Sequence, residues 1–191
     1  MRVIAGRYKG RRLAAPTWPG LRPTSDRLKE SLFEILSSAL PGARVLDGFA
    51  GSGALGIEAL SRGAADVVFV EQDGRAAALV ERNLAQCGIA GGYAMIRAEF
   101  GLALRQMPAG SRFDLALLDP PYDEPDLAAV LDQAAGRMAP GGVMVLEHAS
   151  RRPVPERAGG FAAGRRVTAG DSAVTFYREA GRTATEVTEE R

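Results

Sequence analysis

The chain has 191 residues, which predicts one domain large enough to bury a core without disulfides or structural metals. A composition of 46% apolar and 25% charged residues is typical of a soluble globular protein and argues against a fibrous or disordered chain. No apolar run approaches the ~20 residues that span a bilayer, and the amino terminus lacks the apolar core of a signal peptide. We therefore expect a cytoplasmic protein without membrane contact. With one cysteine, Cys87, and one histidine, His148, we expect neither an internal disulfide nor a metal site.

Positive charge is concentrated at the amino-terminal end, although the net charge of the chain is only +1. The first 29 residues hold eight basic side chains against Asp26 alone, whereas the rest holds 16 basic and 22 acidic side chains. Arg2–Leu13 has β-branched and aromatic residues on both sides of a Lys-Gly pair, which predicts a small hairpin. Tyr8 and Trp18 add ring faces on which bases could stack, so we expect this end to face a nucleic acid. A solvated basic arm is the alternative interpretation.

Three prolines mark residues 14–23 as a loop without helix. After Pro23, one of Thr24, Ser25 and Asp26 can cap a helix that ends at the Pro-Gly pair 41–42. Its apolar positions fall on one face, namely Leu28, Leu32, Ile35, Leu36 and Ala39.

Strands and helices then alternate along the chain. The expected strands are Arg44–Asp47, Asp66–Glu71, Tyr93–Arg97, Phe113–Leu118 and Gly142–Glu147. The expected helices are Ala54–Arg62, Arg75–Cys87, Phe100–Met107 and Asp126–Met138. Apolar strands separated by helices indicate an α/β protein with a parallel sheet covered on both faces.

The pattern changes at the carboxyl-terminal end. Phe161–Thr168 and Ala173–Arg178 flank a Gly-Asp pair with no helix between them, which predicts an antiparallel hairpin. We thus expect a mostly parallel seven-stranded sheet that ends in this hairpin. We divide the chain into a basic extension (1–23), the main domain (24–178) and a disordered tail (179–191).

A glycine-rich turn follows the first strand of the alternating region. Residues 51–56 (GSGALG) match G-x-G-x-x-G between a strand and a helix, with Glu71 about 20 residues further on. This pattern indicates a ligand that contains a nucleoside, with Glu71 accepting hydrogen bonds from the ribose hydroxyls. Asp47 at the end of the strand would repel a pyrophosphate and would suit the ammonium and sulfonium of S-adenosylmethionine. Ala98 and Glu99 follow the third strand, where an adenine should lie, although Glu99 could equally be a helix-start carboxylate.

The sequence Asp119-Pro120-Pro121-Tyr122 after an apolar strand is the most specific signal in the chain. Methylation of an exocyclic base amine requires acceptors that turn the nitrogen lone pair toward the methyl carbon. The Asp119 carboxylate and the Pro120 carbonyl can supply them in a fixed arrangement. Tyr122 offers a ring face for an unstacked base. In-line transfer then needs proximity and no strong general base.

Residues 22–27 (RPTSDR), 45–53 (VLDGFAGSG) and 119–122 (DPPY), in this order, resemble the bacterial 16S rRNA guanine-N2 methyltransferases. The resemblance covers roughly residues 1–178. It implies a Rossmann-like class I methyltransferase fold with a small amino-terminal β-hairpin extension. It also implies methylation of a guanine N2 amine in 16S rRNA of the 30S subunit, or of an assembly intermediate, with S-adenosylmethionine as methyl donor and no metal.

This resemblance and the motifs assign the candidate residues to three groups. The donor site would comprise Asp47, Phe49, Ala50, Gly51, Gly53, Glu71, Gln72, Ala98 and Glu99. The acceptor site would comprise Asp119, Pro120, Pro121 and Tyr122. RNA would contact Arg7, Lys9, Arg11, Arg22, Thr24, Asp26 and Arg27. A monomer is expected, because one face of the chain must dock on something large.

Four other functions fit part of the pattern. The acceptor motif also suits an adenine-N6 DNA methyltransferase, although the chain has no room for a separate target-recognition domain. It suits a protein glutamine methyltransferase too, although those enzymes more often have Asn in place of Asp119. The glycine motif alone would suit a dinucleotide oxidoreductase. The fourth alternative is a non-catalytic RNA-binding assembly factor, in which the donor pocket would have a structural role only.

Overall fold

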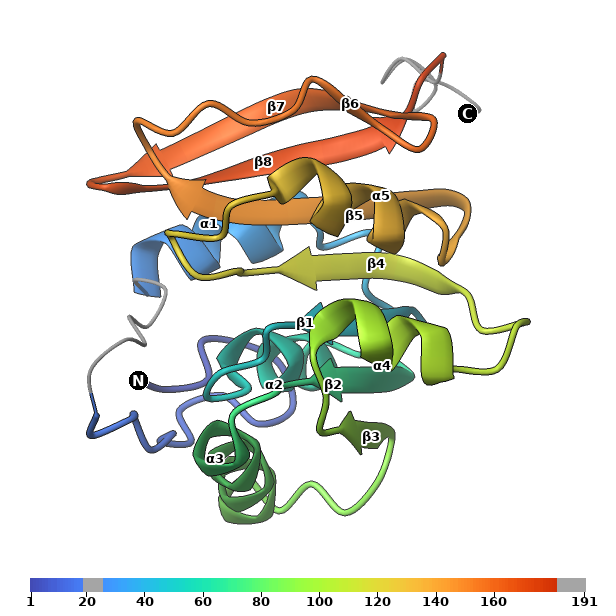
Figure 1. Ribbon diagram of the computed structural model, residues 1–191. Coiled ribbons are helices and arrows are strands. Elements are labelled where there is room, and N and C mark those ends of the chain that lie inside the picture. Colours follow the sequence, from blue (N-terminus) through green and yellow to red (C-terminus); the bar gives the residue numbers. More distant parts are fainter. Residues whose placement is uncertain (19–25, 182–191) are drawn as a thin grey trace, which may run out of the picture.

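The computed structural model describes residues 1–18 and 26–181, and these residues build one sheet with helices on both faces (Figure 1). The strand order is β3-β2-β1-β4-β5-β8-β7-β6. The strands are β1 (Arg44–Gly48), β2 (Asp66–Val70), β3 (Tyr93–Ile96), β4 (Phe113–Leu118), β5 (Met138–Ala149), β6 (Arg157–Ala158), β7 (Phe161–Ala169) and β8 (Ser172–Glu179). The helices are α1 (Asp26–Ile35), α2 (Ala54–Ser61), α3 (Gly74–Gln86), α4 (Phe100–Gln106) and α5 (Leu127–Ala135). The predicted α/β fold with a mainly parallel sheet is confirmed.

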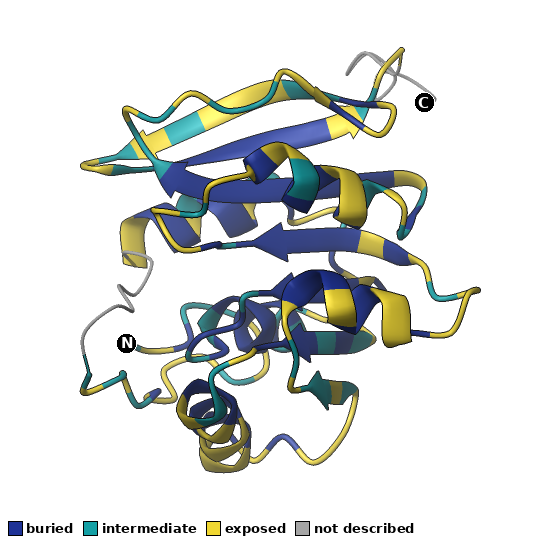
Figure 2. Cartoon of the chain, in the orientation of Figure 1, coloured by how far each residue is buried: buried dark blue, intermediate teal, exposed yellow. Residues whose placement is uncertain are grey.

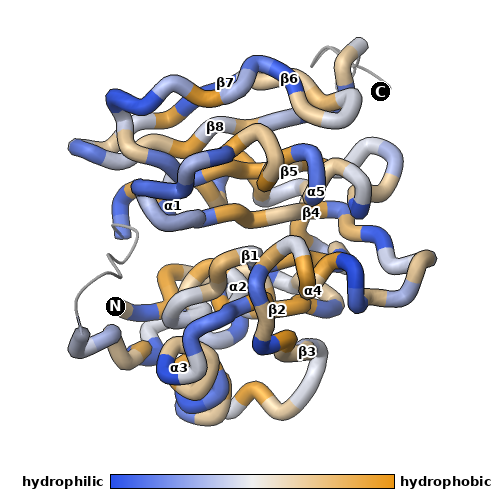
Figure 3. Tube along the Cα trace, viewed as in Figure 1, coloured by the Kyte–Doolittle hydropathy of each residue, from blue (hydrophilic) through white to orange (hydrophobic). Residues whose placement is uncertain are grey.

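Alternate residues of the central strands are buried against different helices. One core cluster joins Val45, Leu115 and Val143 to residues of α1, α2 and α3. The other joins Leu46 and Ala116 to residues of α4 and α5. Burial on both faces explains why these strands are continuous apolar runs in the sequence. Figure 2 shows β4 and β5 mostly as buried, and Figure 3 shows the apolar character of β1, β4 and β5.

The sheet has eight strands in the described residues, so the expectation of seven was wrong by one. The additional strand is the two-residue β6, which pairs with β7 at the edge of the sheet. A strand this short carries no periodicity that a sequence pattern could reveal. The predicted hairpin is present as β7 and β8, and β8 also pairs antiparallel with β5. Gly170 adopts φ 62° in the turn between β7 and β8.

The boundary between α5 and β5 differs from the predicted one. The helix ends at Ala135 instead of Met138, and β5 begins at Met138 instead of Gly142. Met138 pairs with Phe113 of β4, ahead of a register shift in the ladder. Between the two elements, the Arg137 guanidinium donates hydrogen bonds to backbone carbonyls of the α4 region, which include that of Pro108 at 2.8 Å. Gly136 is the C-cap of α5, and the chain enters the ladder with β4 two residues later.

The amino-terminal hairpin is looser than predicted. It contains a single β-bridge, between Arg2 and Arg12, and the residues between them form turns. The backbone N–H groups of Ile4 and Ala5 donate instead to the carboxylate of Glu58 in α2, at 2.8 and 3.0 Å. The segment is therefore held by α2 as well as by backbone hydrogen bonds of its own, which join Val3 to Arg11, Gly10 to Val3 and Leu13 to Met1.

Lys29 belongs to the core, although it was counted among the basic side chains of the amino-terminal end. Lys29 is 1% exposed. Its ammonium nitrogen lies 3.7 Å from a carboxylate oxygen of Glu58 and donates a hydrogen bond to the carbonyl of Arg2 at 2.7 Å. Burial lowers the pKa of Lys29, and the charge of Glu58 opposes that shift. A buried cation with a buried carboxylate satisfies the requirement that charges in the interior be paired.

The predicted caps Thr24 and Ser25, and residues 182–191 of the predicted tail, lie outside the described residues. The tail was predicted to begin at residue 179, but Glu179 is the last residue of β8. Within residues 1–18 and 26–181, the helices are too short or too polar to cross a membrane.

Candidate functional site

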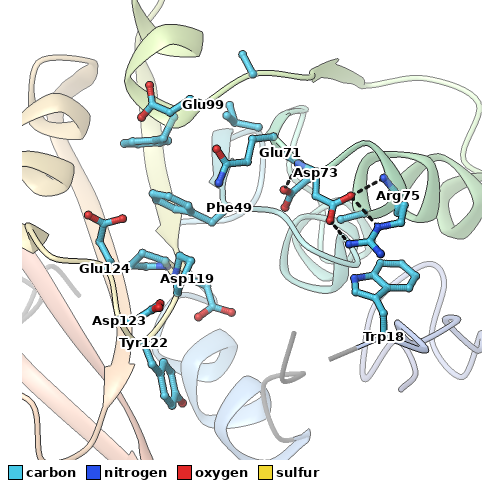
Figure 4. A pocket seen from close by; sticks show the side chains of 17 residues that line it. Trp18, Phe49, Glu71, Asp73, Arg75, Glu99, Asp119, Tyr122, Asp123 and Glu124 are labelled. Atoms are coloured by element: carbon cyan, nitrogen blue, oxygen red, sulfur yellow. Dashed lines mark hydrogen bonds and ion pairs between the residues drawn. The ribbon is translucent and has the colours of Figure 1, made fainter. Parts of the chain in front are cut away.

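The carboxyl ends of three neighbouring strands meet at one edge of the sheet. Gly48 at the end of β1 pairs with Val70 of β2 and with Leu118 of β4, so the segments that follow these strands lie together. A cavity of about 810 Å³ opens there (Figure 4). It is lined by Trp18, Phe49, Val70, Glu71, Gln72, Asp73, Arg75, Ala76, Ala98, Glu99, Phe100, Asp119, Pro120, Pro121, Tyr122, Asp123 and Glu124. This is the edge at which open α/β sheets bind ligands.

The cavity brings together most of the residues that the sequence proposed for the two halves of the site. All four acceptor residues line it, and so do Phe49, Glu71, Gln72, Ala98 and Glu99. The other donor candidates, Asp47, Ala50, Gly51 and Gly53, do not line this cavity.

The loop after β1 is shaped by backbone conformations that few residues adopt. Phe49 has φ 66°, and Gly51 and Gly53 have φ 56° and 76°. The Phe49 ring stacks on Phe100 of α4, with ring centroids 4.8 Å apart. A side chain at Gly48 would meet the Phe100 ring at 2.6 Å, so glycine there leaves room for this stack. Both rings form part of the cavity wall.

Glu71 fixes the glycine loop and the start of α3 at the same time. One carboxylate oxygen accepts a hydrogen bond from the Gly51 N–H and the other from the Asp73 N–H, each at 2.8 Å. A carboxylate has about four acceptor positions, so each oxygen can accept one more hydrogen bond from a ligand. Glu71 is 8% exposed and reaches the cavity, and a ribose contact stays a prediction.

Asp47 has a different environment from the one expected. Its side chain is buried, and its carboxyl accepts a hydrogen bond from the Gly56 N–H at 2.8 Å. Burial raises the pKa of Asp47 to about 8, although the Gly56 hydrogen bond opposes the shift. Asp47 thus has a hydrogen-bond partner at the glycine-rich turn. This geometry does not support the predicted contact between Asp47 and a bound methyl donor.

Glu99 caps a helix. Its two oxygens accept hydrogen bonds from the N–H groups of Gly101 and Leu102 at the start of α4, both at 2.8 Å. The hydrogen bond from Gly101 is the main cause that lowers the pKa of Glu99. Of the two interpretations given from the sequence, the helix-start carboxylate is the one that this geometry supports.

Asp119 stands at the end of β4, facing the cavity. Its backbone N–H lies 3.4 Å from the carbonyl of Gly48, which ties the acceptor loop to the donor loop. Burial raises the pKa of Asp119 well above 3.8, and the nearby carboxyl groups of Glu147 and Asp47 raise it further. Among the described residues, no side-chain hydrogen bond to Asp119 is present, so this carboxyl is available to a ligand.

Two residues that the sequence did not suggest hold the rest of the acceptor loop. Arg152 donates to the carbonyl of Tyr122 at 2.8 Å and also to the carbonyl of Glu124. The hydroxyl groups of Tyr122 and Ser172 are 2.6 Å apart. The sequence around Tyr122 could not reveal either contact, because Arg152 and Ser172 lie 30 and 50 residues after Tyr122 in the chain. Together they fix the position of the Tyr122 ring, which is 37% exposed.

The predicted RNA-binding residues that the structure describes lie outside the cavity. Arg7, Lys9, Arg11, Asp26 and Arg27 are exposed, whereas Arg22 and Thr24 lie outside the described residues. The guanidinium carbons of Arg7 and Arg11 lie 5.5 and 5.8 Å from the centroid of the Tyr8 ring. Arg11 also donates to the carbonyl of Cys87 at 2.6 Å.

The two residues considered as metal ligands have structural partners. Cys87 is buried, and the His148 ring is bonded to the Thr175 hydroxyl and the Ala149 carbonyl, each at 2.9 Å. In residues 1–18 and 26–181, no group of three His, Cys, Asp or Glu side chains is placed to hold a metal ion.

Comparison with known proteins relates nearly the whole chain to one family. The family model described as "Conserved hypothetical protein 95" matches residues 1–178. The Bacillus subtilis protein YlbH is 38% identical over 184 residues, which are 95% of this chain and 100% of that protein. The "Ribosomal RNA small subunit methyltransferase D" of Escherichia coli K12 is 34% identical over 93% of this chain and 89% of its own length. The solved structure of the Escherichia coli protein yhhF superimposes with a TM-score of 0.82 at 32% identity and covers 95% of this chain and 99% of that chain.

Proposed function

The chain belongs to the family described as Conserved hypothetical protein 95, and from that premise we propose that it is an S-adenosylmethionine-dependent rRNA methyltransferase. Its substrate is the exocyclic N2 amine of a guanine in 16S rRNA of the small ribosomal subunit. The name of its Escherichia coli relative, a small subunit rRNA methyltransferase, supports this substrate. The observation that carries the proposal is that Glu71 and Asp119, from the donor and acceptor motifs, line one cavity.

The residues on the donor side fit S-adenosylmethionine. The cavity volume of about 810 Å³ is within the range of roughly 300–1,000 Å³ that is usual for small-molecule sites. Glu71 would accept from the ribose hydroxyls, and the wall formed by Ala98 and Phe100 would face the adenine. Phe49 would lie between these contacts and Asp119. When bound, S-adenosylmethionine supplies an electrophilic methyl group on a sulfonium.

The acceptor loop orients the amine that receives this methyl group. The Asp119 carboxylate and the Pro120 carbonyl would accept the two N–H groups of the guanine amine and turn the nitrogen lone pair toward the donor side. Because both acceptors are fixed before the base enters, little reorganisation is needed. The exposed ring of Tyr122, held by its contact with Ser172, would support the base. Asp119 accepts the stronger hydrogen bond as an ionised carboxylate, so its raised pKa makes the site sensitive to pH.

The basic amino-terminal arm would hold the RNA beside the cavity. Arg7, Lys9 and Arg11 are exposed in a segment that otherwise has few acidic neighbours, so RNA phosphates would be attracted there. We take the 30S subunit, or an assembly intermediate of it, as the physiological form of the substrate, and a monomer as the active form. The protein would act in the cytoplasm, where these particles are made.

The proposal is tested with the purified protein, methyl-labelled S-adenosylmethionine and 30S subunits from cells that lack this enzyme. Label should enter 16S rRNA, and digestion to nucleosides should give N2-methylguanosine by mass spectrometry. Asp119→Ala should abolish incorporation while donor binding, measured by calorimetry, is retained. Duplex DNA and the ribosomal protein fraction serve as control substrates. Label in N6-methyladenosine or in methylglutamine would contradict the proposal, as would a wild-type rate for Asp119→Ala.

A further inference from the structure

Trp18 is the single tryptophan of the chain, and it lines the cavity although it belongs to the amino-terminal segment. Figure 4 shows its ring on the side of the cavity that holds Arg75, Asp73 and Glu71, away from Tyr122. The Arg75 guanidinium carbon lies 5.1 Å from the centroid of one of its rings. This cation–π contact holds the indole against the start of α3.

A series of polar contacts links this ring to the glycine loop. The Arg75 guanidinium pairs with the Asp73 carboxylate at 2.8 Å, and the hydrogen bond from Arg75 is the main cause that lowers the pKa of Asp73 to about 2. The Asp73 N–H donates to Glu71, whose other oxygen accepts from Gly51. Trp18 is therefore placed relative to the same carboxylate that would receive the ribose.

The backbone just before Trp18 is also fixed to the donor loop. Asn83 of α3 is buried, and its amide forms two hydrogen bonds with Ala14, accepting from the N–H at 2.8 Å and donating to the carbonyl at 3.1 Å. The same amide nitrogen donates to the carbonyl of Ser52 in the glycine loop at 2.9 Å. One side chain thus ties the amino-terminal segment to the turn between β1 and α2.

From these contacts we infer that the Trp18 side chain completes the donor site and is a binding residue for the nucleoside part of S-adenosylmethionine. This inference rests on the function proposed above. Asp119 marks the end of the cavity where the methyl group is transferred, and Glu71 marks the ribose end, so a ring on the Glu71 side of the cavity faces the nucleoside. An aromatic face in contact with a nucleoside strengthens binding by about 5- to 150-fold. The segment that carries the RNA-facing charges would then also be needed to hold the donor.

Because the chain has one tryptophan, its fluorescence reports on this site alone. Titration of the wild-type protein with S-adenosylmethionine, and separately with S-adenosylhomocysteine, should change the emission of Trp18 in a saturable way. The midpoint should agree with the dissociation constant from calorimetry. Both measurements are made without RNA, so they do not depend on turnover.

Variants at this position test the contact directly. Trp18→Ala should weaken donor binding at least about 5-fold in calorimetry, whereas Trp18→Phe, which keeps a ring face, should retain most of the affinity. Thr17→Ala is the matched control, because Thr17 is an exposed neighbour that does not line the cavity. Circular dichroism checks that each variant is folded. If Trp18→Ala does not fold, the wild-type titration still decides the question.

The results separate this inference from the proposed function. If the wild-type protein binds the donor without a change in emission, and Trp18→Ala binds as tightly as wild type, Trp18 is not a donor-binding residue and the methyltransferase assignment is untouched. If calorimetry detects no binding of the donor to the wild-type protein, the proposed function itself is contradicted.

Discussion

Replacing Glu58 by alanine tests how the amino-terminal segment is attached to the domain. The Glu58 side chain is 0% exposed and holds the N–H groups of Ile4 and Ala5, the Lys29 ammonium and the Arg62 guanidinium, the last at 2.8 Å. Removing one partner of a buried ion pair costs about 3–5 kcal/mol. The two backbone N–H groups would add to this, but such terms overlap when one side chain makes all the contacts.

We therefore expect Glu58→Ala to lower the free energy of unfolding by about 3–5 kcal/mol. A domain of this kind has about 5–15 kcal/mol in total, so the loss is a large fraction of its stability. Urea denaturation followed by circular dichroism measures the change. With a slope of about 2 kcal/mol per M, the midpoint should fall by roughly 2 M.

A second substitution separates two causes of this loss: the unpaired charge left on Lys29 and the volume removed with the Glu58 side chain. In Glu58→Ala, the Lys29 ammonium remains buried without its carboxylate, so adding Lys29→Met should restore about 1 kcal/mol or more. Glu58→Gln, which keeps the shape but not the charge, should lie between wild type and Glu58→Ala. A loss below about 1 kcal/mol for Glu58→Ala, or a double variant no more stable than the single one, would refute this account of the anchor.

Three further predictions concern activity. The acid limb of the pH–rate profile should have its midpoint well above the usual pKa of an aspartate, because the pKa of Asp119 is raised and its ionised carboxylate is the stronger acceptor for the amine N–H. A profile flat down to pH 4 would argue against this role. Arg152→Ala should lower kcat about 10- to 100-fold and leave the dissociation constant of the methyl donor unchanged, because the loop that carries Tyr122 loses its anchor. An unchanged kcat in single-turnover assays would show that the loop does not need this hydrogen bond. The double variant Arg7→Glu, Lys9→Glu should bind RNA more weakly in filter-binding assays. The slope of the logarithm of the RNA association constant against the logarithm of the salt concentration should become shallower by about 0.7 or more per lost phosphate contact. Equal slopes for the variant and the wild type would mean that these two charges do not contact RNA.

The parts of the structure that the sequence predicted well are those that depend on neighbours in the chain. The strand before Asp119 and the turn at Gly51–Gly53 were both located, because apolar runs and glycines act locally. Lys29 was misplaced when charge was counted along the chain, although its position beside Leu28 and Leu32 in the apolar stripe of α1 was a signal that it is buried.

Contacts between distant segments could not be predicted. Asp47 was expected near the end of the first strand, and it lies in β1, but its partner Gly56 is set by how the loop turns back. Arg152 and Ser172 reach the acceptor loop only because β5 and β8 pair. Trp18 was noted as a ring for stacking, yet its place beside Arg75 depends on how the amino-terminal segment packs on α3.

Glu58, Ser61 and Asn83 form hydrogen bonds that hold the amino-terminal arm, residues 1–18, on the domain. These contacts limit how the arm can be exchanged between proteins. All three anchors belong to α2 and α3, so the described part of the arm is bonded directly to the catalytic domain. A chimera that moved the arm alone to another doubly wound enzyme would lose these acceptors and become a loose cationic tether. Engineers who want to redirect the enzyme to a new RNA would have to transplant the anchors together with the arm.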